Sequence, residues 1–522
     1  MANKNLFKTL VGKFVPTTDA LNEERAPAYK LTPKHQLAQY AATGCLNSTF
    51  YASAGEQLAK VLELCEQVEP EFVARTALYA RRRGHMKDVP ALLCAVLARR
   101  DVSLLAAVFP RVIDNAKMLR NFVQIVRSGA AGRKSLGTAP KRLVREWIDA
   151  RDDAAVFAAS VGQQPSLADI LRMAHPRPRT PEREALFGYL VGREHDARRL
   201  PLVVQQFEAF KAGDTLDVPD VPFQMLTALP LGTSDWTAIA RRAPWQMTRM
   251  NLNTFARHGV FEQPGLPELI AHRISDPEKV RKARVFPYQL LAAYVSADER
   301  VPQLVRDALQ DALEVSTTNV PRIDGKVYVL PDVSGSMHSA VTGQRRGATS
   351  AVRCIDVAAL VAATLLRKNP SAEVIPFESD VVKVQLNPRD SVMTNAQKLS
   401  ALPAGGTNCS APLRHLNLRK AEGDLVVYVS DQESWVDAPQ YGRFGGSRTE
   451  TMREWARFKE RNPRARMVCI DLQPYGTTQA VEREDILNVG GFSDQVFDVL
   501  ADFAQGRHDA GHWVEVIERE EI

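Results

Sequence analysis

The stretch VYVLPDVSGSMHSA (residues 327–340) carries the clearest chemical signal in this 522-residue chain. Its first four residues are mostly apolar, as in a buried strand, and they lead directly into Asp332, Ser334 and Ser336. These three side chains offer hard oxygen ligands, the type that Mg²⁺ prefers. Asp, Ser and Gly also dominate ordinary turns. The stretch by itself leaves two interpretations open, a metal site and a Ser/Gly turn after a strand.

The sequence around this stretch predicts an α/β domain. Short apolar segments (KVYVLPD, AEVIPF, DLVVYVSD, RMVCIDL and, last, DQVFDV at 494–499) alternate with helical ones such as AVRCIDVAALVAATLLRKN at 351–369. Near-continuous apolar strands separated by helices predict a parallel sheet that is covered on both faces. Ligands bind such sheets at the carboxyl ends of the strands. Further polar side chains are therefore expected at other strand ends.

Two such groups follow in the sequence. DLVVYVSD ends in Ser430 and Asp431, and the Gly-rich segment PAGGTNCSAPL presents Thr407 before a helix. Asp-x-Ser-x-Ser at 332–336, a loop threonine and a strand-end aspartate follow one another along the chain. This series resembles the metal-ion-dependent adhesion site of von Willebrand factor A domains. The resemblance implies a doubly wound α/β fold and one divalent cation, with Mg²⁺ as the expected ion. The implied ligands are Asp332, Ser334, Ser336, Thr407 and Asp431.

One residue departs from a regular central strand. Pro331 directly precedes Asp332 and lacks the backbone N–H that a sheet partner would use. The last position of a strand tolerates this loss best, so we expect the strand to end there.

The preceding half, from about residue 30 to 315, is predicted to be helical throughout. GEQLAKVLELCEQV (55–68) has apolar residues at helical spacing, and VPALLCAVLARR (89–100) places a proline in a first turn. Connections are short and rich in Pro or Gly. No strict repeat period is visible, but stacked antiparallel helix pairs of a solenoid remain the natural expectation.

Several segments of this half resemble the TROVE module of Ro proteins. They include ARTALYARRRGHMKDVPALLCAVLA (74–98), LRNFVQIVRSGAAGRKSLGTAPKRLVREW (119–147) and RMNLNTFARHGVF (249–261), in family order. The whole chain is similar to a bacterial member of that family. The resemblance implies a ring of HEAT-like helical repeats whose two ends are joined by the A domain. The expected divisions are an N-terminal arm (1–20), the TROVE module (21–318), the A domain (322–505) and an acidic C-terminal tail (506–522).

The same resemblance implies a function in RNA quality control. Family members bind Y RNA on the outer surface of the ring and take single-stranded 3′ ends of misfolded RNA into its central hole. Bacterial relatives work with an exoribonuclease, polynucleotide phosphorylase. A noncatalytic scaffold, monomeric in the absence of RNA, is therefore expected.

The charge distribution agrees with a polyanionic partner. The net charge is only +6, but residues 75–145 hold 16 Lys and Arg against three acidic residues. Such a surplus attracts phosphate backbones. A solvated basic face without a partner is the alternative. The candidate RNA-binding residues are His85, Lys87, Arg120, Arg127, Arg133, Lys134, Lys141, Arg142 and His175.

The last of these, His175, matches a family histidine at the hole of the ring, although a histidine before proline often simply ends a helix. The family also has basic residues about a dozen positions earlier, and residues 154–166 here contain no Lys or Arg. We therefore expect the hole to bind single-stranded RNA more weakly than a more basic hole would.

Other classes of function would require different features of the sequence. An A-type protein-interaction module would bind a partner's carboxylate through the cation and would not need RNA. A nuclease or an ATP-driven subunit needs chemistry that is missing, because the sequence has no GxxxxGK[ST] motif. Six dispersed cysteines without a CxxC pair and an N-terminus without a long apolar segment predict a reduced, cytoplasmic protein.

Overall fold

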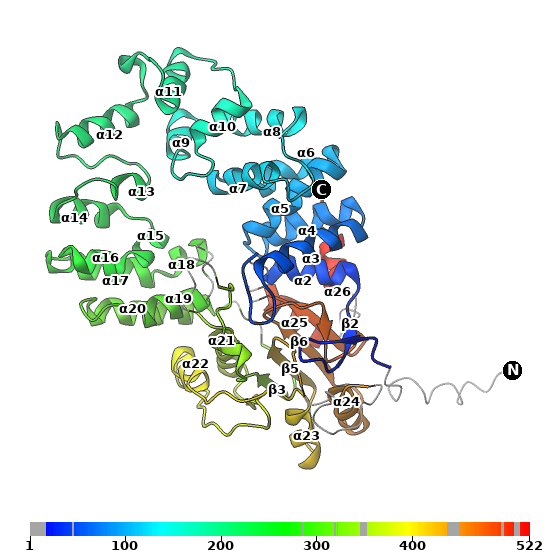
Figure 1. The fold of residues 1–522 in the computed structure, drawn as a ribbon. Coiled ribbons are helices and arrows are strands. Elements are labelled where there is room, and N and C mark those ends of the chain that lie inside the picture. Colours follow the sequence, from blue (N-terminus) through cyan, green and yellow to red (C-terminus); the bar gives the residue numbers. More distant parts are fainter. Residues whose placement is uncertain are drawn as a thin grey trace.

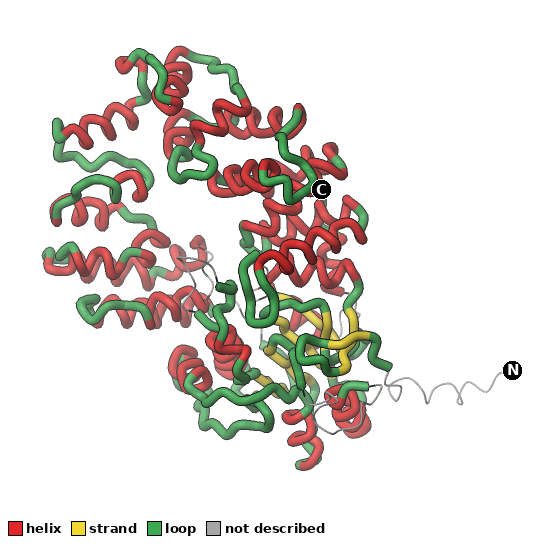
Figure 2. The backbone as a smooth tube through the Cα atoms, in the orientation of Figure 1, coloured by secondary structure: helices red, strands yellow, loops and turns green. Residues whose placement is uncertain are grey.

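The structure is a computed structural model that describes residues 17–43, 46–283, 285, 287–317, 320, 322–344, 352–435, 448–491, 495–505 and 512–522. Residues 1–16, most of the predicted N-terminal arm, lie outside these ranges. Helices run up one side of the molecule and down the other, and the strands gather at the end where the two arms meet (Figures 1 and 2).

The helical half contains short antiparallel helices packed on their neighbours in sequence. They are α2 (Pro33–Thr43), α3 (Ala54–Gln67), α4 (Pro70–Arg82), α5 (Asp88–Arg100), α6 (Val102–Val112), α7 (Ala116–Arg127), α8 (Thr138–Asp149), α9 (Asp153–Ala158), α10 (Leu167–Ala174), α11 (Pro181–Val191), α12 (Leu202–Ala212), α13 (Phe223–Leu226), α14 (Thr233–Arg242), α15 (Trp245–Met250), α16 (Leu252–Arg257), α17 (Leu266–Ser275), α18 (Pro277–Ala283), α19 (Pro287–Val295) and α20 (Gln303–Ser316).

Local sequence explains why these segments are helical. Ser53 and Glu56 form a reciprocal capping box at the start of α3, satisfying backbone N–H groups that the first turn leaves free. Helix α5 is apolar on all sides, and its residues from Val89 to Ala98 are all buried because α4, α6 and α7 surround it. The predicted solenoid of helix pairs is therefore confirmed as a fold.

The second half is a three-layer α/β domain. A parallel sheet has the order β4 (Glu373–Val374), β3 (Val327–Pro331), β5 (Leu425–Ser430), β6 (Arg466–Asp471), β8 (Ile486–Gly490). Alternate strand residues face two separate cores. One core contains α21 (Cys354–Lys368) and α22 (Val392–Ser400), and the other contains α23 (Ala411–Leu418) and α24 (Glu450–Arg461). This is the doubly wound arrangement expected from the sequence.

Pro331 is the last residue of β3 and lies opposite Val429 of β5. Its carbonyl accepts a hydrogen bond from Phe377 N (3.1 Å), and Asp332 N donates to Val429 O (3.0 Å). The proline therefore interrupts no ladder within the strand, and pairing resumes at the next residue.

The α/β domain contacts both ends of the helical half. At the first end, α2 packs on β8, and β2 (Pro27–Lys30) pairs with β1 (Ala20–Leu21) and β7 (Thr477–Thr478). At the other end, α19 contacts α21 and α20 contacts α22. The chain thus forms a helical-repeat ring that is closed by the α/β domain (Figure 1).

Two expectations near the C-terminus were wrong in part. The last strand predicted over 494–499 is wrong for its described part, because 495–504 are helix α25 (Gln495–Ala504) and the outer strand of the described sheet is β8. Residue 494 lies outside the described residues. Val496, Phe497, Val499, Leu500 and Phe503 are buried at helical spacing, a pattern that six residues are too few to reveal.

The predicted acidic C-terminal tail (506–522) contains a helix. Residues 512–518 are helix α26 (His512–Glu518), packed on α2 and α4, with Trp513 and Ile517 fully buried. Part of the predicted tail is therefore a docked element of the ring. The remaining domain boundaries stay predictions.

Within the described residues, no helix is long and apolar enough to cross a membrane. Cys65, Cys94, Cys354, Cys409 and Cys469 are buried and free, as expected for a reduced protein. Cys45 lies outside the described residues.

Candidate functional site

The five predicted metal ligands converge at the carboxyl edge of the sheet. Asp332 follows β3 and Asp431 follows β5, its direct neighbour. Ser334 and Ser336 lie on the loop after β3, and Thr407 lies on the loop before α23. All five are buried, with at most 5% of each residue exposed.

Hydrogen bonds fix the loop around Asp332. Ser334 N donates to Asp332 Oδ1 (2.8 Å), and Ser430 Oγ donates to Asp332 Oδ2 (2.5 Å). The hydroxyls of Ser334 and Ser336 are 3.4 Å apart. Both carboxylate oxygens of Asp332 are therefore oriented before any ligand arrives.

Backbone hydrogen bonds hold the Thr407 loop against the loop that follows β3. Gly335 N donates to Gly405 O (2.9 Å), which joins this loop to the one that carries the serines. Trp435 N donates to Thr407 O (3.1 Å), leaving the threonine hydroxyl outside that contact. The two loops form one rigid oxygen-lined edge.

The electrostatics of this edge favour a cation. Burial raises the pKa of Asp332, and the charge of nearby Asp431 raises it further. Burial also raises the pKa of Asp431, whose Oδ2 is buried and has no hydrogen-bond partner among the described residues. Two desolvated carboxylates, one with an unsatisfied oxygen, are costly unless a positive charge compensates them. The residues present therefore fit a divalent cation.

The donor set also indicates the kind of ion. It contains two carboxylates and three hydroxyls, and no cluster of three or more His, Cys, Asp or Glu suited to a metal occurs in the described residues. Oxygen-only ligands select Mg²⁺-like hard ions over zinc. Occupancy by Mg²⁺ remains a prediction.

Two contributing residues were missed by the sequence analysis. Ser430 holds Asp332 directly. Asp471 ends β6, and burial followed by the charge of Asp431 raises its pKa well above the usual range. Both could have been found, because each stands at the carboxyl end of a strand that was recognised.

The predicted RNA-binding residues occupy one stretch of the ring, α4 to α10, but in different environments. Lys87, Arg127, Lys134, Arg142 and His175 are exposed, whereas His85, Arg120, Arg133 and Lys141 are half-buried. The exposed group can reach a large ligand without rearrangement.

Two of the half-buried arginines have structural partners. Arg133 donates to the carbonyls of Ala98, at the end of α5, and Leu136. Arg120 donates to Ala159 O (3.3 Å), and burial lowers its pKa. These guanidinium groups brace neighbouring helices.

His175 ends α10 in the left-handed backbone region, with φ of 51°. Its backbone N–H donates to Leu171 O (2.9 Å), while the residue itself is exposed. The backbone thus ends a helix, as the alternative interpretation expected, and the imidazole is accessible to a ligand as well.

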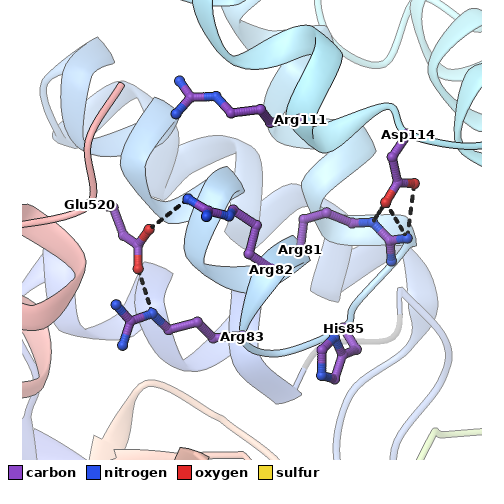
Figure 3. Close-up of a pocket in the computed structure, with 7 residues that line it drawn as sticks. All are labelled: Arg81, Arg82, Arg83, His85, Arg111, Asp114 and Glu520. Carbon is purple, nitrogen blue, oxygen red and sulfur yellow. Dashed lines mark hydrogen bonds and ion pairs between the residues drawn. The ribbon is translucent and has the colours of Figure 1, made fainter. Parts of the chain in front are cut away.

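A basic pocket of about 400 Å³ lies where the end of α4 meets α6 and the C-terminal residues (Figure 3). It is lined by Arg81, Arg82, Arg83, His85, Arg111, Asp114 and Glu520. Of these, only His85 was singled out from the sequence. The run RRRGH within the basic stretch 75–145 was the available signal.

A helical-repeat ring closed by an A-type domain with an oxygen-lined sheet edge defines a narrow class of protein. Comparison with known families agrees. The Ro60 vWA domain model matches residues 326–504, and the TROVE domain model matches 226–361. The chain therefore contains both kinds of domain that these models describe, a TROVE domain and a Ro60-type vWA domain.

Individual relatives are distant in sequence, and the matches differ in how much of the chain they cover. "RNA-binding protein RO60" of Deinococcus radiodurans is 24% identical over 96% of this chain and 99% of its own length. "RNA-binding protein RO60" of Caenorhabditis elegans is 22% identical over 46% of this chain and 36% of its own. The crystal structure of Deinococcus radiodurans RO (RSR) protein has 22% identity and a TM-score of 0.62, covering 91% of this chain and all of that one. At this identity the structural match supports the fold.

Proposed function

We propose that this protein is a noncatalytic RNA-binding scaffold of RNA quality control. The observation that supports the proposal most is a group of exposed basic residues on α7, α8 and their connection, namely Arg127, Lys134 and Arg142. The relatives of the chain are named RNA-binding proteins. A local excess of exposed Lys and Arg attracts phosphate backbones by counterion release.

In this proposal, structured RNA of the Y RNA class binds the outer surface through Arg127, Lys134 and Arg142. Each is exposed. Among the described residues no ion pair of Lys134 would need to be displaced, and the ion pair of Arg142 with Glu146 is long, at 3.7 Å. An exposed pair of this kind costs little to break.

Single-stranded 3′ ends of misfolded RNA would enter the central hole of the ring, with His175 offering its exposed imidazole. The protein would pass such RNA to an exoribonuclease, of which polynucleotide phosphorylase is the expected example. We expect it to act as a cytoplasmic monomer when RNA is absent.

The divalent-cation site belongs to a second, compatible function. With Mg²⁺ bound, Asp332 and Asp431 would supply the charged ligands and Ser334, Ser336 and Thr407 neutral oxygens. The neutral ligands leave the ion free to accept a further carboxylate. The buried Asp431 Oδ2, which has no hydrogen-bond partner among the described residues, supports the cation itself. A cation with an open position would let the A domain bind an acidic group on a protein partner.

Affinity purification from lysate tests the proposal, with bound RNA sequenced and bound proteins identified. We expect enriched small structured RNAs that are lost in a Lys134→Glu/Arg142→Glu variant. An Asp332→Ala variant should keep those RNAs and lose a protein partner. If the wild-type protein enriches no RNA, the proposal is wrong.

A further inference from the structure

The C-terminal residues lie on the basic part of the ring. Trp513 of α26 is fully buried, and its Nε1 donates to the hydroxyl of Tyr79 on α4 (3.0 Å). Lys34 pairs with Glu518 (2.8 Å), and Arg75 donates to Glu520 O (2.7 Å). These contacts position the four residues after α26 over the end of α4.

There, Glu520 enters the basic pocket between two arginines (Figure 3). Its Oε1 is 2.6 Å from Arg83 Nε, and its Oε2 is 3.8 Å from Arg82 Nη1. Arg111 Nη1 donates to Glu521 O (2.8 Å). The Glu520 side chain is 5% exposed, so its charge is almost fully covered by the pocket.

The pocket nevertheless holds more positive than negative charge. Four arginines face two carboxylates, Asp114 and Glu520. Asp114 is occupied by Arg81, which donates to both of its oxygens at 2.7–3.0 Å. Arg82 and Arg83 therefore share one carboxylate, and their side chains are still 55% and 46% exposed. Arg111 donates to backbone carbonyls, those of Glu521 and Ala107.

We propose that Arg82, Arg83 and Arg111 form a binding site for a backbone phosphate of RNA, and that Glu520 occupies this site as an intramolecular competitor. Guanidinium groups bind carboxylate and phosphate with the same donor geometry. The phosphate of a polyanion also releases counterions, which a single carboxylate does not. The inference rests on the RNA-binding function proposed above.

Displacement does not require the helix to leave. The buried contacts of α26 are made by Trp513 and Ile517, and Glu520 lies two residues beyond the end of the helix. In this proposal the Glu520 carboxylate leaves the pocket when residues 519–522 move, while α26 stays packed on α2 and α4. RNA and the C-terminal residues thus compete for one site.

The test measures the affinity of the full chain for a fluorescently labelled hairpin RNA at several salt concentrations. Glu520→Gln removes the competing charge, so we expect binding that is about threefold to tenfold tighter. Glu515→Gln is the matched control, because Glu515 lies close by in the chain, on α26, and pairs with Arg519 (3.0 Å) outside the pocket. It should leave the affinity unchanged.

Arg82→Ala/Arg83→Ala should weaken binding and reduce the salt slope by about one per lost phosphate contact. In that background, Glu520→Gln should give no gain. Melting temperatures confirm that each variant folds, and deletion of residues 520–522 provides a second way to remove the carboxylate.

The inference is overturned if Glu520→Gln and the deletion bind like the wild type. It is also overturned if Glu520→Gln gives the same gain when Arg82 and Arg83 are absent, since the effect would then be one of net charge alone. A wild-type protein that binds no RNA contradicts the RNA-binding function itself, which separates the two failures.

Discussion

At the level of single residues, His175 combines a backbone role with an exposed ring. Its left-handed backbone, with φ of 51°, makes alanine an unsuitable probe, whereas asparagine tolerates that region. If the imidazole contacts RNA, His175→Asn should lower affinity for a duplex with a 3′ tail and spare a blunt hairpin. Its melting temperature should stay close to that of the wild type.

His175→Gly is a second variant that also removes the imidazole, and glycine accepts the left-handed backbone, so it should show the same selective loss for the tailed RNA. Equal losses for tailed and blunt RNA, accompanied by a lower melting temperature, would show a purely structural histidine.

Asp332 carries the second prediction at this scale. A ligand that binds only the folded state stabilises it, by about 2.7 kcal/mol at one hundred times its Kd. Magnesium should therefore raise the melting temperature of the wild type, and Asp332→Ala should abolish the increment while hairpin RNA affinity stays unchanged. Glu460→Ala, an exposed carboxylate on α24, should retain the increment. If magnesium leaves the melting temperature of the wild type unchanged, the predicted cation site is wrong.

At the level of elements, the connection between α7 and α8 bears Lys134 and α8 bears Arg142, and both residues are exposed. Reversing both charges should reduce RNA affinity and lower the salt slope by about one per phosphate contact. Stability should change little, because both side chains are exposed. Titrations with RNA at increasing salt measure both quantities.

Arg257→Glu/Lys282→Glu is the matched control, because it makes the same change in net charge on exposed residues of α16 and α18. Identical slopes for the two double variants would mean that net charge alone attracts the RNA and that α7–α8 is not the binding surface.

At the level of the whole molecule, closure of the ring depends on a buried pair between α2 and the A domain. His35 Nε2 lies 2.8 Å from Asn488 O on β8, and His35 Nδ1 lies 3.7 Å from Glu482 Oε2. Burial lowers the pKa of His35 to about 4 and raises the pKa of Glu482 to about 8. Both groups are therefore neutral in the closed ring near pH 6.

The sign of the pH dependence follows from these values. Below pH 6.5 the unfolded chain protonates its histidine and the folded one does not, so stability falls between pH 6.5 and 4, by about 3 kcal/mol at pH 4. Glu482 stabilises the fold fully below its ordinary pKa of 4.5, and this contribution is lost as pH rises through about 8.

Denaturant unfolding across this range should show that His35→Gln flattens the acid limb and Glu482→Gln the alkaline limb. His272→Gln, which removes an exposed histidine of α17, should leave both limbs as in the wild type. An unchanged acid limb in His35→Gln would show that this contact does not govern closure.

Much of this protein follows from its sequence because the deciding patterns are local. Apolar periodicity predicted α3, and a proline suited to a first turn predicted α5. The strand ends at Asp332 and Asp431 predicted a shared sheet edge, since parallel strands bring their carboxyl ends together. The same reasoning was wrong for residues 494–499, where six residues cannot distinguish a short strand from one face of a helix.

Only the tertiary structure decided what depends on contacts between distant segments. That Glu520 lies between Arg82 and Arg83 could not be inferred from local patterns, because these contacts join residues more than 400 positions apart. Charge runs show where basic residues are concentrated. Burial and the partners that folding supplies then determine which of them brace the ring, as Arg133 does, and which remain available to a ligand.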